Sequence, residues 1–371
     1  MIFIEDICYI ISDFLFYSKD IISFFNVNKL TRRCKFNITL DSYCNNYNNF
    51  SNFNITKILS TFNNFNSITI NNSLQHLALS YKYSNELNIL EKIPNLINLH
   101  TLALSNIKLT DKILEKLVNL TSLNIGYINC NNFTGECLQK FTKLKTLKLG
   151  YTFIDSKYIQ NLTKLEKLYI NTQFNINNFH KLTNLHVLDV SVSEYVITDE
   201  TILSLTNLRV LKCKYSTISK IDHLLNLKVL ILGLNYVMKK IYNNKLHTLS
   251  ISSSKVRYIY VPNIIKLVLN ECISDNLLKK CTTLQDLHFG NNTIITDDGI
   301  QSLVNLTTLH CNFNRNITNK GIADLKKIIK IHCGFNYLNV DHLSNLHCLE
   351  HYEYNDSINL ESVKLLINRT I

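Results

Sequence analysis

A short hydrophobic phrase recurs through most of this chain at nearly even intervals. It has the form L-x-x-L-x-L, with Ile or Val replacing Leu in places, and successive phrases begin about 21 residues apart. One such phrase arises easily by chance, but a long series in phase requires a fold built from stacked repeats. The phrases begin at Leu74, Leu99, Leu120, Leu144, Leu165, Leu185, Leu208, Leu227, Leu246, Ile264, Leu284, Leu306, Ile328 and Leu349.

Each phrase predicts one short β-strand. If the first Leu is position one, positions four and six point into the core, and positions three, five and seven point to the open side. A shift of one residue would exchange the two sets. We therefore expect burial of Leu147, Leu168, Leu188, Leu211 and Leu230. We expect the open side to carry Lys148, Tyr169, Asp189, Lys212 and Ile231.

The residues that follow each phrase predict how its strand ends. Position nine carries small polar side chains that can bond backbone groups where the chain turns away. These are Thr152, Ser216, Asn235, Ser254, Cys272, Asn292, Asn314 and Asn336. Short helices are predicted where a Thr cap precedes acidic residues, at Thr110-Asp111, Thr198-Asp199 and Thr296-Asp297. The phrases from Leu227 to Ile264 lie closer together, which predicts extended or single-turn connections there.

The repeats over residues 74 to 354 resemble the leucine-rich-repeat superfamily. The Thr-Asp phrases and Cys272 are most similar to its cysteine-containing subfamily. The resemblance implies an α/β solenoid, a horseshoe whose concave face is a parallel sheet. Such a face is a shallow surface without a deep, water-excluding pocket, so it favours protein binding over catalysis. No Gly-rich phosphate loop, nucleophile elbow or paired acid and base is visible, and we expect neither an enzyme nor a cofactor.

The N-terminal segment does not repeat, and it resembles an F-box. The matching residues are Phe3, Asp6, Ile7, Ile11, Leu15, Asp20, Ile21, Val27 and Lys29, while Ile4, Asn28 and Thr31 replace the family's Pro, Cys and Trp. The resemblance implies a helical module that docks on the adaptor of a cullin-RING ubiquitin ligase, with contacts from Ile7, Ile11, Leu15, Asp20, Ile21 and Val27. The alternative is a helical cap that covers the open end of the solenoid core.

These features predict four segments. Residues 1–40 form the F-box-like module, 41–73 an Asn-rich linker or cap, 74–354 the repeats, and 355–371 a C-terminal cap. Charged residues interrupt the apolar N-terminus, so we expect no signal or membrane segment and an intracellular protein, cytoplasmic or nuclear. The partners expected are the adaptor and a protein substrate. The net charge of +11 is scattered along the sequence, and a nucleic-acid partner is not expected.

Two groups on the open side are candidate sites. Valines at position three of consecutive strands, surrounded by charge, favour a protein-docking patch, although high strand propensity explains valines equally well. This patch comprises Tyr169, Val187, Asp189, Val210, Lys212, Lys214, Val229 and Ile231. At position five, the last four phrases carry His288, His310, His332 and Glu353. These imidazoles could bind a metal or titrate together, but a polar ladder without metal is the stronger interpretation.

Cysteines also occur at inward positions. Cys213, Cys311 and Cys333 fall at position six, which predicts small buried apolar residues and not nucleophiles. The chain has 11 Cys and no C-x-x-C pair, which favours free thiols in a reducing compartment.

Overall fold

The structure is a computed structural model. It describes residues 35–40, 54–60, 74–80, 93–105, 109–126, 133–150, 154–171, 179–193, 196–235, 237–252, 256–269, 274–290, 294–334, 338, 343 and 346–353. The chain divides into two compact units, Met1–Leu185 and His186–Ile371. The residues expected to contact the adaptor lie outside the described part of the chain. In the described residues, no helix combines the length and hydrophobicity needed to cross a bilayer.

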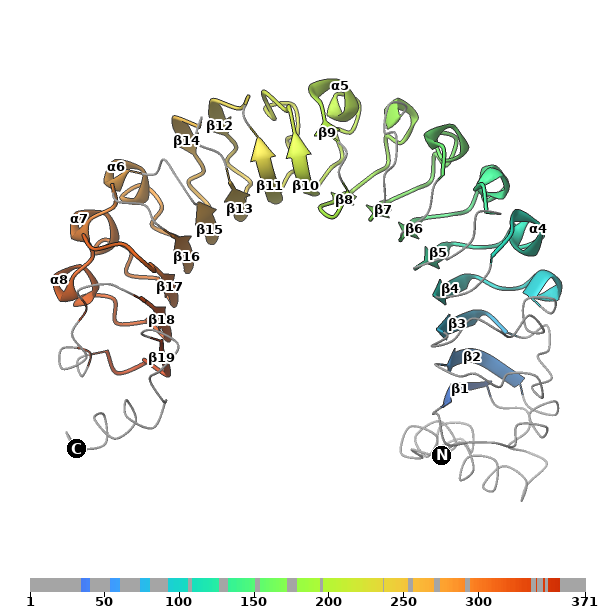
Figure 1. Cartoon of the computed structure of the whole chain (residues 1–371), viewed down its shortest axis with the longest axis horizontal. Helices are drawn as coiled ribbons and strands as arrows, with labels where there is room; N and C mark the ends of the chain where they lie inside the picture. Colours follow the sequence, from blue (N-terminus) through green and yellow to red (C-terminus); the bar gives the residue numbers. More distant parts are fainter. Residues whose placement is uncertain are drawn as a thin grey trace, which may run out of the picture. The chain divides into compact units, whose positions relative to one another are not determined.

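The first unit contains parallel strands that pair in chain order (Figure 1). They are β1 (Lys35–Leu40), β2 (Asn54–Ser60), β3 (His76–Ser80), β4 (Thr101–Ser105), β5 (Ser122–Ile125), β6 (Thr146–Leu149) and β7 (Lys167–Ile170). The sheet thus begins before residue 74, because β1 pairs with β2 and β2 pairs with β3. The first two strands precede the first L-x-x-L-x-L phrase, so the repeat pattern did not predict them.

The second unit continues the same architecture. Its strands are β8 (Val187–Val190), β9 (Val196–Ile197), β10 (Val210–Ser216), β11 (Val229–Asn235), β12 (Lys240–Tyr242), β13 (Thr248–Ile251), β14 (Tyr258–Tyr260), β15 (Lys266–Leu269), β16 (Asp286–Phe289), β17 (Thr308–His310), β18 (Lys330–His332) and β19 (His351–Glu353). The main sheet has the order β8-β10-β11-β13-β15-β16-β17-β18-β19, all parallel. β12 and β14 form a separate parallel pair.

The predicted register is confirmed. Leu147, Leu168, Leu188, Leu211 and Leu230 are fully buried, whereas their outward neighbours are half-buried or exposed. On adjacent strands, residues at the same phrase position are register partners, so Leu188, Leu211 and Leu230 form one continuous row. Burying a leucine stabilises the fold by about 1.5–3 kcal/mol. The rows of leucines therefore supply most of the hydrophobic core.

Short helices lie on the side of the repeats away from the strands. The α-helices are α4 (Asp111–Leu114), α5 (Asp199–Ile202), α6 (Asp275–Leu278), α7 (Asp297–Ile300) and α8 (Asn319–Ile322), and the 3-10 turns are η3 (Ile93–Asn95), η4 (Glu136–Lys140), η5 (Ser156–Tyr158) and η6 (Phe179–Lys181). The three helix starts predicted from Thr-Asp pairs are confirmed at α4, α5 and α7. Figure 1 shows α6, α7 and α8 stacked in sequence opposite their strands.

Two repeats of the second unit have extended connections instead of helices, as their short spacing predicts. β12 and β14 occupy the places where other repeats have helices. An extended residue advances about 3.3 Å and a helical residue only 1.5 Å, so a shorter connection covers the same distance only if it is extended.

Asparagines at position nine bond the backbone where strands end. The Asn235 side chain is buried, and its Nδ2 donates to the Ser216 hydroxyl (2.8 Å) and to the Ile218 carbonyl (2.9 Å). Its Oδ1 accepts from the backbone N–H of Val237 and of Met238, both at 2.9 Å. Asn314 repeats the arrangement, donating to the Ile295 carbonyl at 3.1 Å. The predicted role of position nine is confirmed at both asparagines.

Candidate functional site

The open side of the main sheet in the second unit, here called the open strand face, consists of two rows of outward residues. Strand register aligns these residues across the strands from β8 to β18. The position-three row reads Val187, Val210, Val229, Thr248, Lys266, Asp286, Thr308 and Lys330. The position-five row reads Asp189, Lys212, Ile231, Ser250, Val268, His288, His310 and His332. The face therefore has an apolar end and a polar end.

The apolar end is built on β8, β10 and β11. Val187, Val210 and Val229 are direct register partners on these strands. Each is half-buried and not freely exposed, because side chains on parallel strands about 4.8 Å apart cover one another. Ile231 extends the patch on β11 and is also half-buried. The four side chains thus form one continuous apolar surface.

Charged side chains border this surface and are already paired. Lys212 lies beside Asp189 with Nζ 3.3 Å from Oδ2, and only 14% of the Asp189 side chain is exposed. Asp189 Oδ1 also accepts the Ser191 hydroxyl at 2.6 Å. Lys214 lies over the Tyr215 ring, 5.0 Å from its centre. A partner would therefore meet an ordered charged border around the valines.

Tyr169 belongs to the first unit, where it lies on β7. Its half-buried ring is covered by Lys148 Nζ at 4.7 Å from the ring centre, and Lys148 and Tyr169 are register partners. The predicted outward orientation of Tyr169 is confirmed.

The polar end contains a stack of histidines. The rings of His288 and His310 are 3.8 Å apart with planes at 14°, and those of His310 and His332 are 4.0 Å apart at 9°. Direct pairing of their strands produces this stacking. Glu353 is the backbone register partner of His332 on β19, and its side chain lies outside the described part of the structure.

An acid and a base extend the stack. His288 Nε2 lies 2.6 Å from Asp286 Oδ1, and Lys266 Nζ lies 2.7 Å from Asp286 Oδ2. The sequence analysis did not predict a role for Asp286 and Lys266, although both stand at outward position three of their L-x-x-L-x-L phrases. The signal was their register, since Lys266 and Asp286 face each other on β15 and β16.

Two histidines of the stack, His288 and His310, have lowered pKa values. Burial lowers the pKa of His288 below its usual 6.5, although the Asp286 carboxylate opposes this shift. Burial and the two flanking histidines lower the pKa of His310 to about 4. Both imidazoles are therefore neutral at pH 7, which allows close stacking without charge repulsion.

The geometry of the stack does not suit metal binding. Ring nitrogens hold their lone pairs in the plane of the ring, so stacked rings direct them side by side and not toward one point. Zinc needs ligands that converge at about 2.0–2.1 Å. Across the described part of the chain, no three His, Cys, Asp or Glu side chains are placed to hold a metal ion.

The inward cysteines lie in the core, as predicted. Cys213, Cys311 and Cys333 are buried, and burial raises the pKa of the Cys213 thiol to about 12. A thiol with a raised pKa stays protonated and is a poor nucleophile. These residues therefore pack as small apolar side chains.

Comparison with known proteins supports the fold. No protein-family model matches the sequence, and no curated protein matches it. Among solved structures, a leucine-rich-repeat protein of Leptospira interrogans is 21% identical, with a TM-score of 0.59 over 81% of this chain and 84% of that one. The functional domain of InlJ from Listeria monocytogenes, which includes a cysteine ladder, is 18% identical with a TM-score of 0.55, over 73% of this chain and 60% of that one.

A plant receptor also resembles this chain. The ectodomain of the receptor kinase GASSHO1/SCHENGEN3 from Arabidopsis thaliana, in complex with CASPARIAN STRIP INTEGRITY FACTOR 2, is 16% identical with a TM-score of 0.53. The match covers 81% of this chain and 47% of that one. The shared feature is the repeat architecture, and this chain has the leucine-rich-repeat fold.

Proposed function

We propose that this chain is a non-enzymatic binding protein whose open strand face docks a protein partner. The observation that carries the proposal is the in-register row of Val187, Val210 and Val229 beside the ion pair of Lys212 and Asp189. Interfaces obtain most of their affinity from a few apolar or aromatic anchors surrounded by polar residues. Solved repeat proteins of the same fold include receptors in complex with partners such as CASPARIAN STRIP INTEGRITY FACTOR 2.

The more specific proposal is a substrate receptor of a cullin-RING ubiquitin ligase. It rests on the F-box-like residues of segment 1–40, which would dock the adaptor while the open strand face selects a substrate. The alternative is a repeat protein that acts as a scaffold, in which segment 1–40 only caps the solenoid. Only binding to the adaptor distinguishes these two proposals, because both assign partner binding to the same open strand face.

The docking patch can be tested by proximity labelling in cells, with a labelling enzyme fused to the full chain. The test variant changes Val187, Val210, Val229 and Ile231 to Ser. Its matched control changes four exposed apolar residues elsewhere in the second unit to Ser: Val192, Leu203, Leu225 and Val304. We expect the test variant to lose the labelling of proteins that the wild type labels, while its Tm stays nearly unchanged. The control variant should keep that labelling. Unchanged labelling would mean that the valines reflect strand propensity alone.

The adaptor is tested separately with purified proteins and calorimetry. Full-length chain carrying Ile21→Asp and Val27→Asp should lose adaptor binding and keep its Tm. The control carries Leu203→Asp and Leu225→Asp, at two exposed positions of the described part. Absence of adaptor binding by the wild type, or unchanged binding by the test variant, would refute the F-box assignment.

A further inference from the structure

The pair of strands β12 and β14 presents an aromatic and basic surface on the side away from the open strand face. Lys240 pairs with Tyr258 and Tyr242 pairs with Tyr260 in the strand register, so the four side chains form a two-by-two grid. The three tyrosines are 64%, 65% and 45% exposed for Tyr242, Tyr258 and Tyr260. Three rings this exposed in one small area form a surface suited to a ligand.

The rings already interact as a stack. Tyr242 and Tyr260 lie face to face with ring centres 4.9 Å apart and planes at 14°. Lys240 Nζ lies 5.5 Å from the centre of the Tyr258 ring. Exposed Lys239 and Arg257 stand where the two strands begin, joined by the Arg257 N–H donating to the Lys239 carbonyl at 2.9 Å. Aromatic faces and cations are thus interleaved.

The grid is held in place from below and at both ends. Ile241 is buried beneath it. At one end, Asn235 accepts the N–H of Met238, and at the other, Asn243 donates its backbone N–H to the Tyr260 carbonyl at 3.1 Å. The buried Asn243 side chain also donates to the Leu224 carbonyl at 3.3 Å. The tyrosines of the grid therefore need little ordering when a ligand binds.

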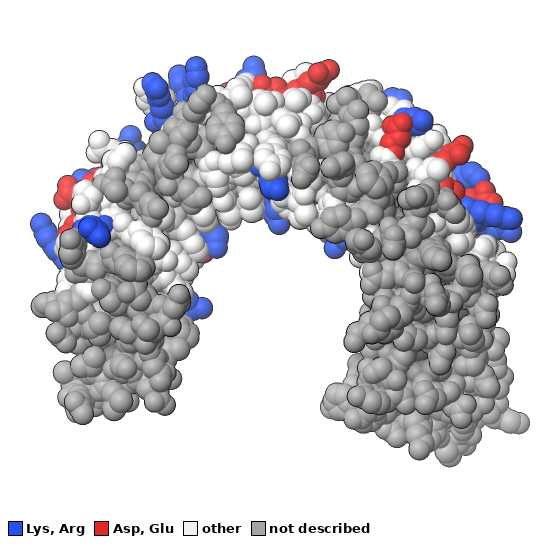
Figure 2. All heavy atoms as spheres, viewed as in Figure 1, with Lys and Arg blue, Asp and Glu red and all other residues white. Residues whose placement is uncertain are grey.

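The stretch of sequence that contains the grid has basic but no acidic residues. Between Asp222 and Glu271 the sequence contains no acidic residue. The same segment carries Lys228, Lys239, Lys240, Lys245, Lys255, Arg257 and Lys266. Figure 2 shows Lys and Arg side chains gathered near β12 and β14, without acidic side chains among them. A ligand for this surface should be an anion with flat, unpaired ring systems.

We propose that the β12–β14 surface binds single-stranded nucleic acid, with bases stacking on the tyrosines and phosphates meeting Lys239, Lys240 and Arg257. Sequence-tolerant proteins bind single strands by combining aromatic platforms with basic side chains. An acidic protein segment could pair with the cations but, without aromatic rings of its own, would leave the tyrosine faces unused. Sequence reasoning did not anticipate this site, since Tyr242 and Tyr260 are far apart in the sequence and only parallel pairing joins them.

The probe is a fluorescein-labelled twelve-nucleotide uridine strand, measured by anisotropy with the full chain at low salt, and a thymidine strand of equal length tests for sugar preference. The variant Tyr242→Leu with Tyr260→Leu should bind about tenfold or more weakly, since stacking contributes about 1–3 kcal/mol per base. Its salt dependence should be unchanged. Tyr242→Phe with Tyr260→Phe keeps the rings and should retain binding.

The variant Lys240→Gln with Arg257→Gln should weaken binding and make its salt dependence shallower, by about 0.7 in the logarithmic slope for each cation removed. The matched control is Lys157→Gln with Tyr158→Leu, because Lys157 also lies over a tyrosine ring, at 4.8 Å. This control should bind like the wild type.

Four results would overturn the proposal. The first two are absence of binding at low salt and equal losses of affinity in the control and test variants. The third is unchanged affinity after both tyrosines become leucine. The fourth is a polyglutamate peptide that displaces the labelled strand as well as the unlabelled strand does. The last result would identify a surface for acidic protein segments. Circular dichroism melting of every variant verifies that it is folded.

Discussion

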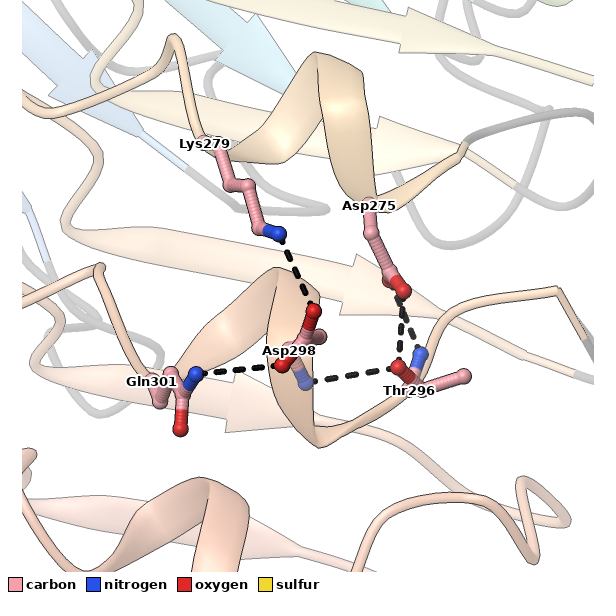
Figure 3. A network of polar contacts seen from close by, with 5 residues as sticks. All are labelled: Asp275, Lys279, Thr296, Asp298 and Gln301. Atoms are coloured by element: carbon pink, nitrogen blue, oxygen red, sulfur yellow. Dashed lines mark hydrogen bonds and ion pairs between the residues drawn. The ribbon is translucent and has the colours of Figure 1, made fainter.

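The carboxylate of Asp275 accepts two hydrogen bonds from Thr296 of the following repeat. Thr296 donates its backbone N–H to Oδ1 at 2.9 Å and its hydroxyl to Oδ2 at 2.7 Å (Figure 3). The same Thr296 hydroxyl accepts the N–H of Asp298 at 3.3 Å and so caps α7. One threonine therefore starts its own helix and joins it to the helix before.

The contact recurs along the outer side of the repeats. In each case an aspartate at the first residue of a helix accepts the N–H and hydroxyl of a Ser or Thr in the next repeat. The further pairs are Asp111 with Thr134, Asp199 with Ser219, and Asp297 with Thr318. For Asp111, burial raises the carboxyl pKa, but the hydrogen bonds from Cys137 and Thr134 outweigh it, and the net pKa is lowered. The charged form is the one that joins the repeats.

Asp275→Ala should destabilise the second unit. The change removes two charge-assisted hydrogen bonds and leaves the Thr296 N–H without its acceptor, at a cost of about 1–3 kcal/mol. The matched control is Asp298→Ala, one helix further on, whose carboxylate is 64% exposed and pairs with Lys279 at 3.1 Å. Exposed pairs contribute about 0–1 kcal/mol. Urea unfolding measures the free energy of unfolding of both variants. Equal losses of stability would contradict a special role for Asp275.

Gly299→Ala should destabilise the same contact. A Cβ at Gly299 would collide with Oδ1 of Asp275, which sits against that backbone. Overpacking a close contact costs about 1–3 kcal/mol. The matched control is Gly290→Ala, where a Cβ would meet no atom within 4 Å and stability should stay nearly constant.

A double-mutant cycle separates the carboxylate from the backbone. In Asp275→Ala with Gly299→Ala, the loss should be smaller than the sum of the single losses, because the colliding oxygen is gone. Part of the cost should remain, since the Asp275 Cα also lies 3.1 Å from the added Cβ. Additive free energies of unfolding would show that the two residues do not interact.

The hydrophobic phrases predicted the strands because their information is local. Leu188 and Leu211 are inward by alternation alone, and Thr296 marks its helix by the residues that follow it. Contacts between repeats were harder to predict. Asp286 contacts Lys266 because equal phrase positions pair on adjacent strands, and the nature of both side chains has to be read together to see the ion pair. Tyr242 stacks on Tyr260 because two connections outside the phrases pair with each other, which the phrases do not predict.

The half-burial of the valine row was likewise not predicted. Alternation assigns Val210 to the open side correctly, but it does not include the neighbouring strands that cover part of the side chain. Strands β1 and β2 were missed for a different reason. Phe36, Ile38 and Leu40 alternate as in an ordinary strand, but the segment lacks the phrase that marks the later repeats.

Asn235→Ala should destabilise the second unit by about 2–4 kcal/mol, because it removes a buried amide and leaves the N–H groups of Val237 and of the buried Met238 without their acceptor. Asn226→Ala, at an exposed position, is the matched control and should change the free energy of unfolding by less than about 0.5 kcal/mol. Both are compared by urea unfolding at pH 7. Similar losses in the two variants would show that the Asn235 bonds contribute nothing particular.

The histidine stack should make the second unit less stable in acid. The folded pKa of His310 is about 4, below the usual 6.5, so the unfolded chain binds more protons between these values. The stabilising effect of keeping His310 neutral is therefore complete above pH 6.5 and is lost as the pH falls toward 4. Solvent screening at this half-buried site reduces it to on the order of 1 kcal/mol. His310→Gln should flatten the dependence of the second unit's free energy of unfolding on pH in this window. An unchanged slope in His310→Gln would mean that other groups cause the acid sensitivity.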